Sequence, residues 1–343
     1  MMIQGVLGPI PPSELGITLT HEHLFLDARP SWRAPTEASR KSSALLPVTP
    51  DLLHVLRSDP FMNLDNCSLF DEEVAVEEVS RFRDAGGRTI VDATCRGIGR
   101  DPRALQRVAR RTGLNVVMGT GFYLERTHPP YVAGATVEEL AAIMVSDIVD
   151  GDEQTGVRAG YIGEIGTGPA FTPQERKVLA AAARAQAYTG VALAVHLHAW
   201  GRHGHAVLDI VAENGGDIER TILDHMNPSW SDVDYQLALC DRGAYLSYDM
   251  IGLDYYFGPD DLQSPSDEES ARGIVGLIGR GHLRQLLLSH DVFLKMMLVR
   301  HGGNGYAYLL DNFVPRLRRH GVSDTQIDAL VIGNPAEILA VPE

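Results

Sequence analysis

The chain has 343 residues, 44% of them hydrophobic and 22% charged, so it is long enough for one large domain or two small ones. Its formal net charge of −15 argues against nucleic acid or an anionic membrane as partner and favours a small-molecule substrate. The three cysteines form no C-x-x-C pair and no apolar run approaches the ~18 residues of a membrane span, so we expect a cytoplasmic protein without disulfides.

The first part of the chain predicts one strand between two irregular segments. Residues 3–15 contain Gly-Pro and Pro-Pro pairs and indicate a small hairpin that closes the floor of the fold. The apolar and β-branched run at 17–21 predicts the first strand. Residues 28–70, with prolines at 30, 35, 47, 50 and 60, indicate a long insertion after that strand.

From residue 71 onward, helical and strand patterns alternate. The predicted helices span 72–85, 101–112, 137–149, 172–188, 205–214, 231–242 and 266–280. The predicted strands span 89–94, 114–119, 158–163, 191–196, 220–225, 244–249 and 286–291, and residues 306–340 predict a terminal helical cap.

Eight apolar strands that alternate with helices are what a closed (β/α)8 TIM barrel requires. We therefore predict an α/β fold in which residues 1–343 form a single barrel domain, with the 28–70 insertion on the active-site face and a C-terminal helical cap. A doubly wound open sheet is the alternative architecture, but the glycine-rich phosphate turn that it needs after the first strand is missing.

Metal-ligand residue types occur where the predicted strands end. His21 and His23 have the spacing that turns both imidazoles to one face of a strand, although two solvated histidines would show the same pattern. The C-terminal strand tips of a barrel converge on one cavity, and the candidate ligands at these tips are His21, His23, Glu164, His196, His225 and Asp291. One zinc with an open position needs about three protein ligands, so this set predicts two metals with a shared carboxylate. A bridging hydroxide, formed because the metals lower the pKa of water from ~15.7 toward ~7, is the expected nucleophile.

Other polar residues near the strand ends have less defined roles. His198 would point the same way as His196 but lies beyond the tip, so it is the alternative ligand there. Asp224 and His290 have the opposite parity to their neighbours and are expected to face the helices as hydrogen-bonded groups. Glu22 points away from the cavity and is expected to be a structural partner of the ligands.

Three loop residues are candidates for anchoring an anionic substrate tail: Arg100, His128 and His301.

The segments at 8–10, 14–16 and 18–23 read Gly-Pro-Ile, Glu-Leu-Gly and Thr-Leu-Thr-His-Glu-His, which resembles the N-terminal signature of the phosphotriesterase family of the amidohydrolase superfamily. Segments 119–128, 162–166 and 302–306 look most like the phosphotriesterase-related branch, some members of which were named resiniferatoxin-binding proteins. The resemblance implies a barrel with two divalent ions, expected to be Zn²⁺ with Mn²⁺, Co²⁺ or Fe²⁺ as alternatives. It also implies a homodimer, because homologues in this family are commonly dimeric.

By this similarity the metal ligands divide into two sets. His21, His23 and Asp291 would bind the buried metal, His196 and His225 the more exposed one, and Glu164 would bridge both. The founding enzymes carry a carboxylated lysine at the bridge, whereas the related branch uses glutamate, which supplies the same single negative charge.

Further departures concern the substrate. Pro228 replaces an acidic residue proposed to relay protons in organophosphate hydrolases, and Met250 stands where those enzymes often have histidine. Tyr123 aligns with a tyrosine that lines the lactonase pocket, where it would hydrogen-bond the substrate oxygen or only form the wall.

The expected activity is hydrolysis of a carboxylic ester, lactone or amide, with at most weak phosphotriesterase activity, and Asp291 would accept the proton of the hydroxide. The alternatives are a non-catalytic small-ligand-binding barrel, an efficient organophosphate triesterase and a mononuclear deaminase-like barrel.

Overall fold

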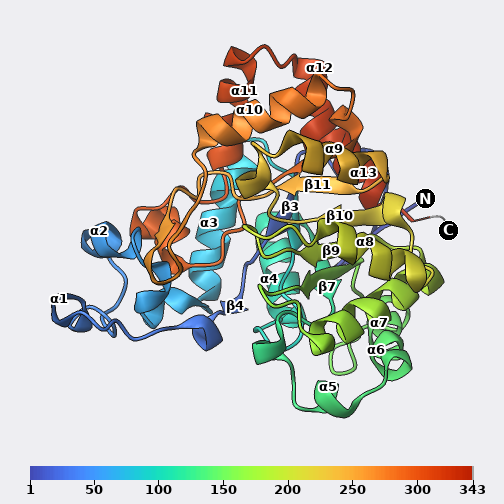
Figure 1. Ribbon diagram of the computed structural model, residues 1–343, viewed down its shortest axis with the longest axis horizontal. Coiled ribbons are helices and arrows are strands. Elements are labelled where there is room, and N and C mark those ends of the chain that lie inside the picture. Colours follow the sequence, from blue (N-terminus) through green and yellow to red (C-terminus); the bar gives the residue numbers. More distant parts are fainter. Residues whose placement is uncertain (342–343) are drawn as a thin grey trace.

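A computed structural model describes residues 1–341 and contains one sheet of eight parallel strands in the order β14-β11-β10-β9-β8-β7-β6-β3 (Figure 1). The strands are β3 (Thr18–Glu22), β6 (Thr89–Asp92), β7 (Asn115–Thr120), β8 (Tyr161–Gly166), β9 (Leu193–His196), β10 (Thr221–Leu223), β11 (Tyr245–Tyr248) and β14 (Leu286–Leu288). Side chains link the first strand to the last: the Thr20 hydroxyl donates to the Leu288 carbonyl at 3.4 Å, and the His21 backbone N–H donates to Ser289 Oγ at 3.0 Å. The sheet is therefore a nearly closed barrel, which confirms the predicted (β/α)8 fold.

The barrel strands are buried on both faces because helices cover the outside and side chains fill the inside. Every residue of β6, β8 and β11 is buried, as expected of a parallel sheet enclosed on both sides. The interior near the floor is filled by residues from successive strands, including Val91, Val117, Ile222 and Leu287. The barrel is thus a packed core whose open end lies at the strand tips.

The seven predicted helices follow the strands with small shifts at their ends, and the short helix α5 was not predicted. They are α3 (Glu72–Asp84), α4 (Pro102–Thr112), α5 (Tyr131–Gly134), α6 (Val137–Val149), α7 (Pro173–Thr189), α8 (Gly204–Glu213), α9 (Val233–Asp241) and α10 (Asp267–Ile278). Helix α7 shows why the helix ends could be predicted from the sequence. Thr172 and Glu175 form a capping box, Pro173 occupies the first turn, and Gly190 ends the helix at φ 71°. None of the helices described over residues 1–341 has the length and apolar character needed to cross a bilayer.

The two ends of the chain close the floor of the barrel. Strands β1 (Ile3–Gly5) and β2 (Gly8–Ile10) form the predicted antiparallel hairpin, and Ile3 packs into the floor cluster. The C-terminal region is helical, as predicted, with α11 (Val314–Arg319), α12 (Asp324–Asp328), α13 (Asn334–Leu339) and two π-helical turns. Met2 pairs with Val341, which places the N- and C-terminal regions side by side (Figure 1).

The insertion forms a separate lobe beside the barrel (Figure 1). Its base is closed by β4 (Leu26–Asp27) and β5 (Ser68–Leu69), which pair antiparallel, and it contains α1 (Ala38–Lys41) and α2 (Leu53–Leu56). The insertion also contacts the loop that carries β12 (Tyr256–Phe257) and β13 (Leu262–Gln263), because the Tyr256 N–H donates to the Arg57 carbonyl at 2.9 Å. The insertion therefore packs against the loop that follows β11.

Candidate metal centre

The structure brings together the six side chains that the sequence indicated as metal ligands, although they come from five different strands. His21 lies in β3 and Glu164 in β8, while His196 ends β9. His23, His225 and Asp291 lie just beyond the ends of β3, β10 and β14. Strand β8 begins and ends later than the predicted 158–163, so Glu164 belongs to the strand itself.

Glu164 is at the centre of this group. Its Oε1 atom lies 3.4 Å from His23 Nε2, and its Oε2 atom lies 3.2 Å from His196 Nδ1 and 3.5 Å from His21 Nε2. His225 Nε2 is 3.8 Å from the same Oε2 atom. One carboxylate therefore contacts all four imidazoles.

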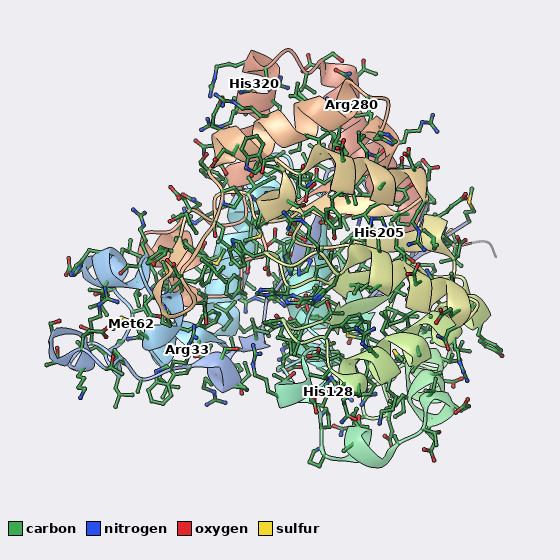
Figure 2. The ribbon with its side chains drawn as sticks, in the orientation of Figure 1. Arg33, Met62, His128, His205, Arg280 and His320 are labelled. Carbon is green, nitrogen blue, oxygen red and sulfur yellow. The ribbon has the colours of Figure 1, made fainter. Side chains whose placement is uncertain are left out.

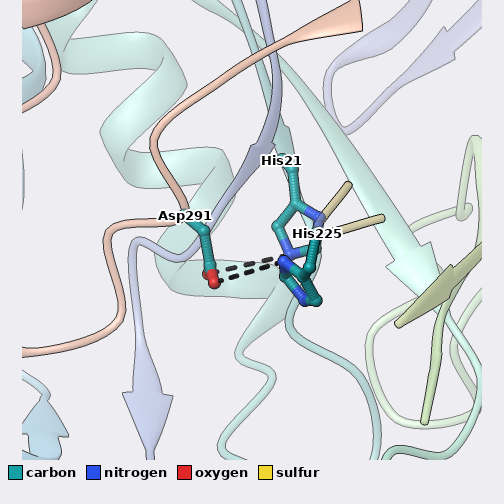
Figure 3. Close-up of side chains that lie close together, drawn as sticks. All are labelled: His21, His225 and Asp291. Carbon is teal, nitrogen blue, oxygen red and sulfur yellow. Dashed lines mark ion pairs between the residues drawn. The ribbon is translucent and has the colours of Figure 1, made fainter. Parts of the chain in front are cut away.

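Asp291 closes the group from the opposite side. Its Oδ1 atom lies 3.3 Å from His23 Nε2 and 3.7 Å from His21 Nε2, and its Oδ2 atom lies 3.8 Å from the His225 ring. Figure 3 shows the Asp291 carboxylate facing the His21 and His225 rings from a separate chain segment.

Two of these residues have an uncommon backbone conformation. His225 has φ 61° and Asp291 has φ 54°, in the left-handed region that non-glycine residues rarely adopt. Hydrogen bonds hold both: Asp249 accepts from the His225 N–H at 2.9 Å, and the His21 carbonyl accepts from the Asp291 N–H at 3.2 Å. Such strain concentrates at functional sites, where the surrounding structure compensates for it.

Three imidazoles, those of His21, His23 and His225, point Nε2 into the centre and are oriented by contacts of their Nδ1 atoms. His23 Nδ1 lies 2.9 Å from the Thr94 hydroxyl, which itself donates to the Phe25 carbonyl, so His23 Nδ1 must be the donor. His225 Nδ1 donates to Asp249 Oδ1 at 3.0 Å, and His21 Nδ1 lies 3.2 Å from Asp249 Oδ2. With Nδ1 protonated, His21 and His23 present the Nε2 lone pair to Glu164, and His225 presents its own to His196 Nδ1 at 2.7 Å. Metal-ligating histidines are held in the same way.

The unpartnered atoms of the centre indicate a cation. Within the ligand group, three buried atoms lack a hydrogen-bond partner among residues 1–341: His21 Nε2, Glu164 Oε2 and Asp291 Oδ1. All three can offer a lone pair, and His21 Nε2 lies 3.5 Å from Glu164 Oε2 and 3.7 Å from Asp291 Oδ1. Buried acceptors without a donor are costly, and a divalent cation satisfies all three at once. The residues therefore fit a metal, and ligand atoms of two triads that share Glu164, His21–His23–Glu164 and Glu164–His196–His225, lie within 4.8 Å of one another.

The electrostatics of the centre agree with this fit. Burial opposes protonation of His23, but hydrogen bonds from the protonated ring to Asp291 and Glu164 outweigh it and raise the His23 pKa to about 9. Burial disfavours the charge of Glu164, yet the positive charge of His21 and hydrogen bonds from the other histidines bring the Glu164 pKa well below its usual value. The carboxylates thus attract positive charge to the imidazole nitrogens, where a metal would bind instead of protons.

Four polar residues lie next to the proposed ligands, and only two of them have the role expected from the sequence. Glu22 accepts hydrogen bonds from Ser289 and His290, the structural role expected of both Glu22 and His290. Asp224 does not face the helices as predicted: its Oδ1 atom lies 3.4 Å from His21 Nδ1, inside the barrel, and burial raises its pKa to about 6. Asp249 was not identified from the sequence, although it ends a predicted strand and the rule that found the other ligands applies to it.

A cavity of about 690 Å³ opens over the centre, between the strand tips and the insertion. His23, Glu164, His196, His225 and Asp291 form part of its lining. Most of the remaining wall is apolar and includes Trp32, Phe61, Leu124, Trp200, Met250, Leu253, Phe257, Leu262 and Phe293.

Tyr123 and His198 both line this cavity. The Tyr123 hydroxyl lies 3.3 Å from His196 Nδ1, and burial with the charge of Glu164 raises the Tyr123 pKa well above its ordinary value. The phenol therefore stays protonated. His198 lies in the wall beside Trp200, outside the ligand group.

The three candidates for an anionic subsite do not line the cavity in the described residues. Arg100 is 4% exposed and pairs with Asp147 and Asp152 at 2.9 Å, because a buried guanidinium needs carboxylate partners. His128 donates to the Tyr123 carbonyl at 2.8 Å, and His301 binds the Val48 carbonyl at 3.0 Å. All three hold loops in place, so the expectation of substrate contact is corrected.

Comparison with known proteins identifies the fold and its relatives. The family model described as "Phosphotriesterase family" matches residues 1–339. The chain belongs to the phosphotriesterase family.

Members of this family resemble the chain over its whole length. An N-acetyltaurine hydrolase of Danio rerio is 37% identical over 97% of this chain and 96% of its own length. The crystal structure of a resiniferatoxin-binding protein from Rhodobacter sphaeroides superposes with a TM-score of 0.97 at 48% identity, covering 98% of this chain and 94% of that one. A phosphotriesterase homology protein from Escherichia coli, complexed with phosphate in its active site, gives a TM-score of 0.78 at 32% identity, covering 95% and 99%. These relatives of the phosphotriesterase family match the predicted branch.

Proposed function

We propose that the chain is a zinc-dependent hydrolase with two divalent cations that acts on a carboxylic amide, ester or lactone. The observation that carries the proposal is the group of six inward-facing ligand side chains around Glu164, at the base of a large cavity. Membership of the phosphotriesterase family and a relative named N-acetyltaurine hydrolase support hydrolysis, and the relative's name favours an amide.

The distances favour a division of the ligands between two cations. His21, His23 and Asp291 would hold the buried cation, and His196 with His225 the exposed one. Glu164 would serve both, since Oε1 faces His23 and Oε2 faces His196. When bound, two such cations would polarise the scissile carbonyl and lower the pKa of a water toward ~7.

The chain's own residues would carry the proton and orient the substrate. The Asp291 carboxylate borders the cavity and would accept the proton of the attacking water, then pass it to the leaving nitrogen or oxygen. The Tyr123 hydroxyl, held protonated beside His196, would donate a hydrogen bond to the oxygen on which negative charge develops.

The cavity wall favours a carbonyl substrate. Its apolar surface suits an acyl group, and Met250, which lines it, offers no proton-transferring atom where organophosphate hydrolases often have histidine.

The proposal is tested by metal analysis combined with a panel of amide, ester, lactone and phosphotriester substrates. About two zinc ions per chain and turnover that is lost in Glu164→Ala, but retained in the exposed control Glu153→Ala, would support it. A folded, metal-free and inert protein would indicate a binding protein. One metal per chain with an unimpaired Glu164→Gln variant would indicate a mononuclear enzyme.

A further inference from the structure

The cavity contains four charged side chains outside the metal centre: Asp27, Arg33, Arg126 and Asp260. Asp27 is neutralised by Arg29, whose guanidinium binds both carboxylate oxygens at 2.7 and 2.6 Å. Arg33 and Asp260 neutralise each other through two hydrogen bonds of 2.9 and 2.7 Å, and Figure 2 shows Arg33 in the insertion. These three charges are therefore already balanced.

Arg126 is different, because it forms no ion pair with any residue in the described range 1–341. Its hydrogen bond goes to a neutral group, the Ser31 hydroxyl, at 2.9 Å. A guanidinium has five donors in a planar fork, so Arg126 retains donors that are free to bind an oxyanion. An unbalanced positive charge in the wall of a substrate cavity is notable in a chain whose net charge is −15.

Arg126 also has the right neighbours for a substrate contact. It lies in the short turn Glu125–Thr127 that follows Tyr123, and Ser31 belongs to the insertion across the cavity. Tyr123 and Arg126 both line the cavity, three residues apart in the chain. A substrate whose carbonyl lies at Tyr123 would therefore extend its far end toward Arg126.

We propose that Arg126 is a specificity-determining residue that binds an anionic end of the substrate, on the leaving portion of an amide. This inference rests on the proposed hydrolase function and names the substrate class of that site. A carboxylate or sulfonate presents paired oxygens that match the guanidinium fork, and Arg126 compensates for the repulsion from the carboxylates of the centre. Arg126 thus takes the role for which the sequence offered Arg100, His128 and His301.

The test compares substrates that differ in charge but little in shape. N-acetyltaurine and N-acetyl-β-alanine are the anionic substrates, and N-propylacetamide is the neutral one. The measured quantity is the ratio of kcat/KM for each anionic substrate to kcat/KM for the neutral amide. In Arg126→Ala this ratio should fall about 10- to 100-fold, the range expected for a charge-assisted hydrogen bond, mainly through KM. Arg126→Lys should recover part of the loss.

Arg103→Ala, on α4 and away from the cavity, is the matched control and should keep the wild-type ratio. An unchanged ratio in Arg126→Ala would overturn the proposal, and Arg126 would then be a solvated loop residue. Unequal losses for the taurine and β-alanine amides would distinguish a sulfonate from a carboxylate ligand.

The subsite and the hydrolase function can fail separately. If wild-type protein hydrolyses only the neutral amide, the anionic subsite is refuted and the hydrolase stands. If it hydrolyses none of the three, the hydrolase function for amides is refuted. Calorimetric titration with N-acetyltaurine then decides the subsite alone: weaker binding to Arg126→Ala than to wild type supports it, and equal binding or none refutes it.

Discussion

The Oδ1 atom of Asp249 accepts both the Nδ1–H of His225 at 3.0 Å and its backbone N–H at 2.9 Å. The other oxygen of the same carboxylate lies 3.2 Å from His21 Nδ1. One buried side chain therefore orients a proposed ligand of each cation and also holds the left-handed backbone of His225.

Asp249→Asn should weaken metal binding about 10- to 100-fold, because the amide offers one acceptor where the carboxylate offers two and no longer fixes both imidazoles. Competition with a chelator measures the metal affinity, and circular dichroism checks the fold. The exposed Asp254→Asn variant is the control. Equal metal affinity in the two variants would show that the histidines are oriented without Asp249.

Glu22→Gln should destabilise the loop that carries Asp291. The Glu22 carboxylate accepts from the backbone N–H of His290 and of Val292, both at 2.9 Å, so it contacts the chain on both sides of Asp291. The glutamine NH₂ group would face one of these N–H donors, and an unsatisfied buried donor costs about 1 to 3 kcal/mol.

For Glu22→Gln, urea unfolding measures the free energy of unfolding, and kcat on the preferred substrate reports the position of Asp291. Glu14→Gln, which is exposed, should change neither. If Glu22→Gln unfolds at the wild-type urea concentration, its contacts with this loop contribute little to stability.

Tyr123→Phe should lower kcat about 10²-fold with a smaller change in KM, because the lost hydroxyl would stabilise charge that develops only in the transition state. Steady-state kinetics on the best amide or lactone substrate provide the measurement. Tyr188→Phe is the control, because Tyr188 is 76% exposed. A kcat equal to that of wild type would mean that the Tyr123 ring only forms the cavity wall.

Asp147→Asn should cost about 3 to 5 kcal/mol at neutral pH, because it leaves the buried Arg100 guanidinium with one carboxylate fewer. Burial would raise the pKa of Asp147, but Arg100 and hydrogen bonds from Arg96 and Thr120 outweigh burial and lower it. The stabilisation is therefore fully present above the ordinary aspartate pKa of ~3.9 and is lost as the pH falls through the lower folded-state value.

A pH series of urea unfolding tests this prediction. The difference in unfolding free energy between wild type and Asp147→Asn should shrink on acidification below about pH 4. Asp150→Asn, exposed at the end of α6, should show no such difference. A difference that is constant across the series would mean that the Asp147 charge does not stabilise the fold.

Much of this protein could be predicted from local patterns. The eight strands were recognisable because each is an apolar run followed by a helix with its own start and stop residues, as in α7. His21 and His23 were recognisable because the two-residue period of a strand turns both to one face. Such features depend on neighbours in the chain, so the sequence alone determined the barrel and the candidate ligands.

Tertiary structure decided which charged side chains have a partner of opposite charge. Arg100 and Arg126 both follow barrel strands and look alike in the sequence, yet Arg100 is buried between Asp147 and Asp152. Within residues 1–341, Arg126 contacts only the neutral Ser31 hydroxyl. The role of Asp249 depends on its contact with His21, which is far from it in the sequence. Contacts of this kind depend on which distant segments lie together around the barrel, and a local sequence pattern does not determine them.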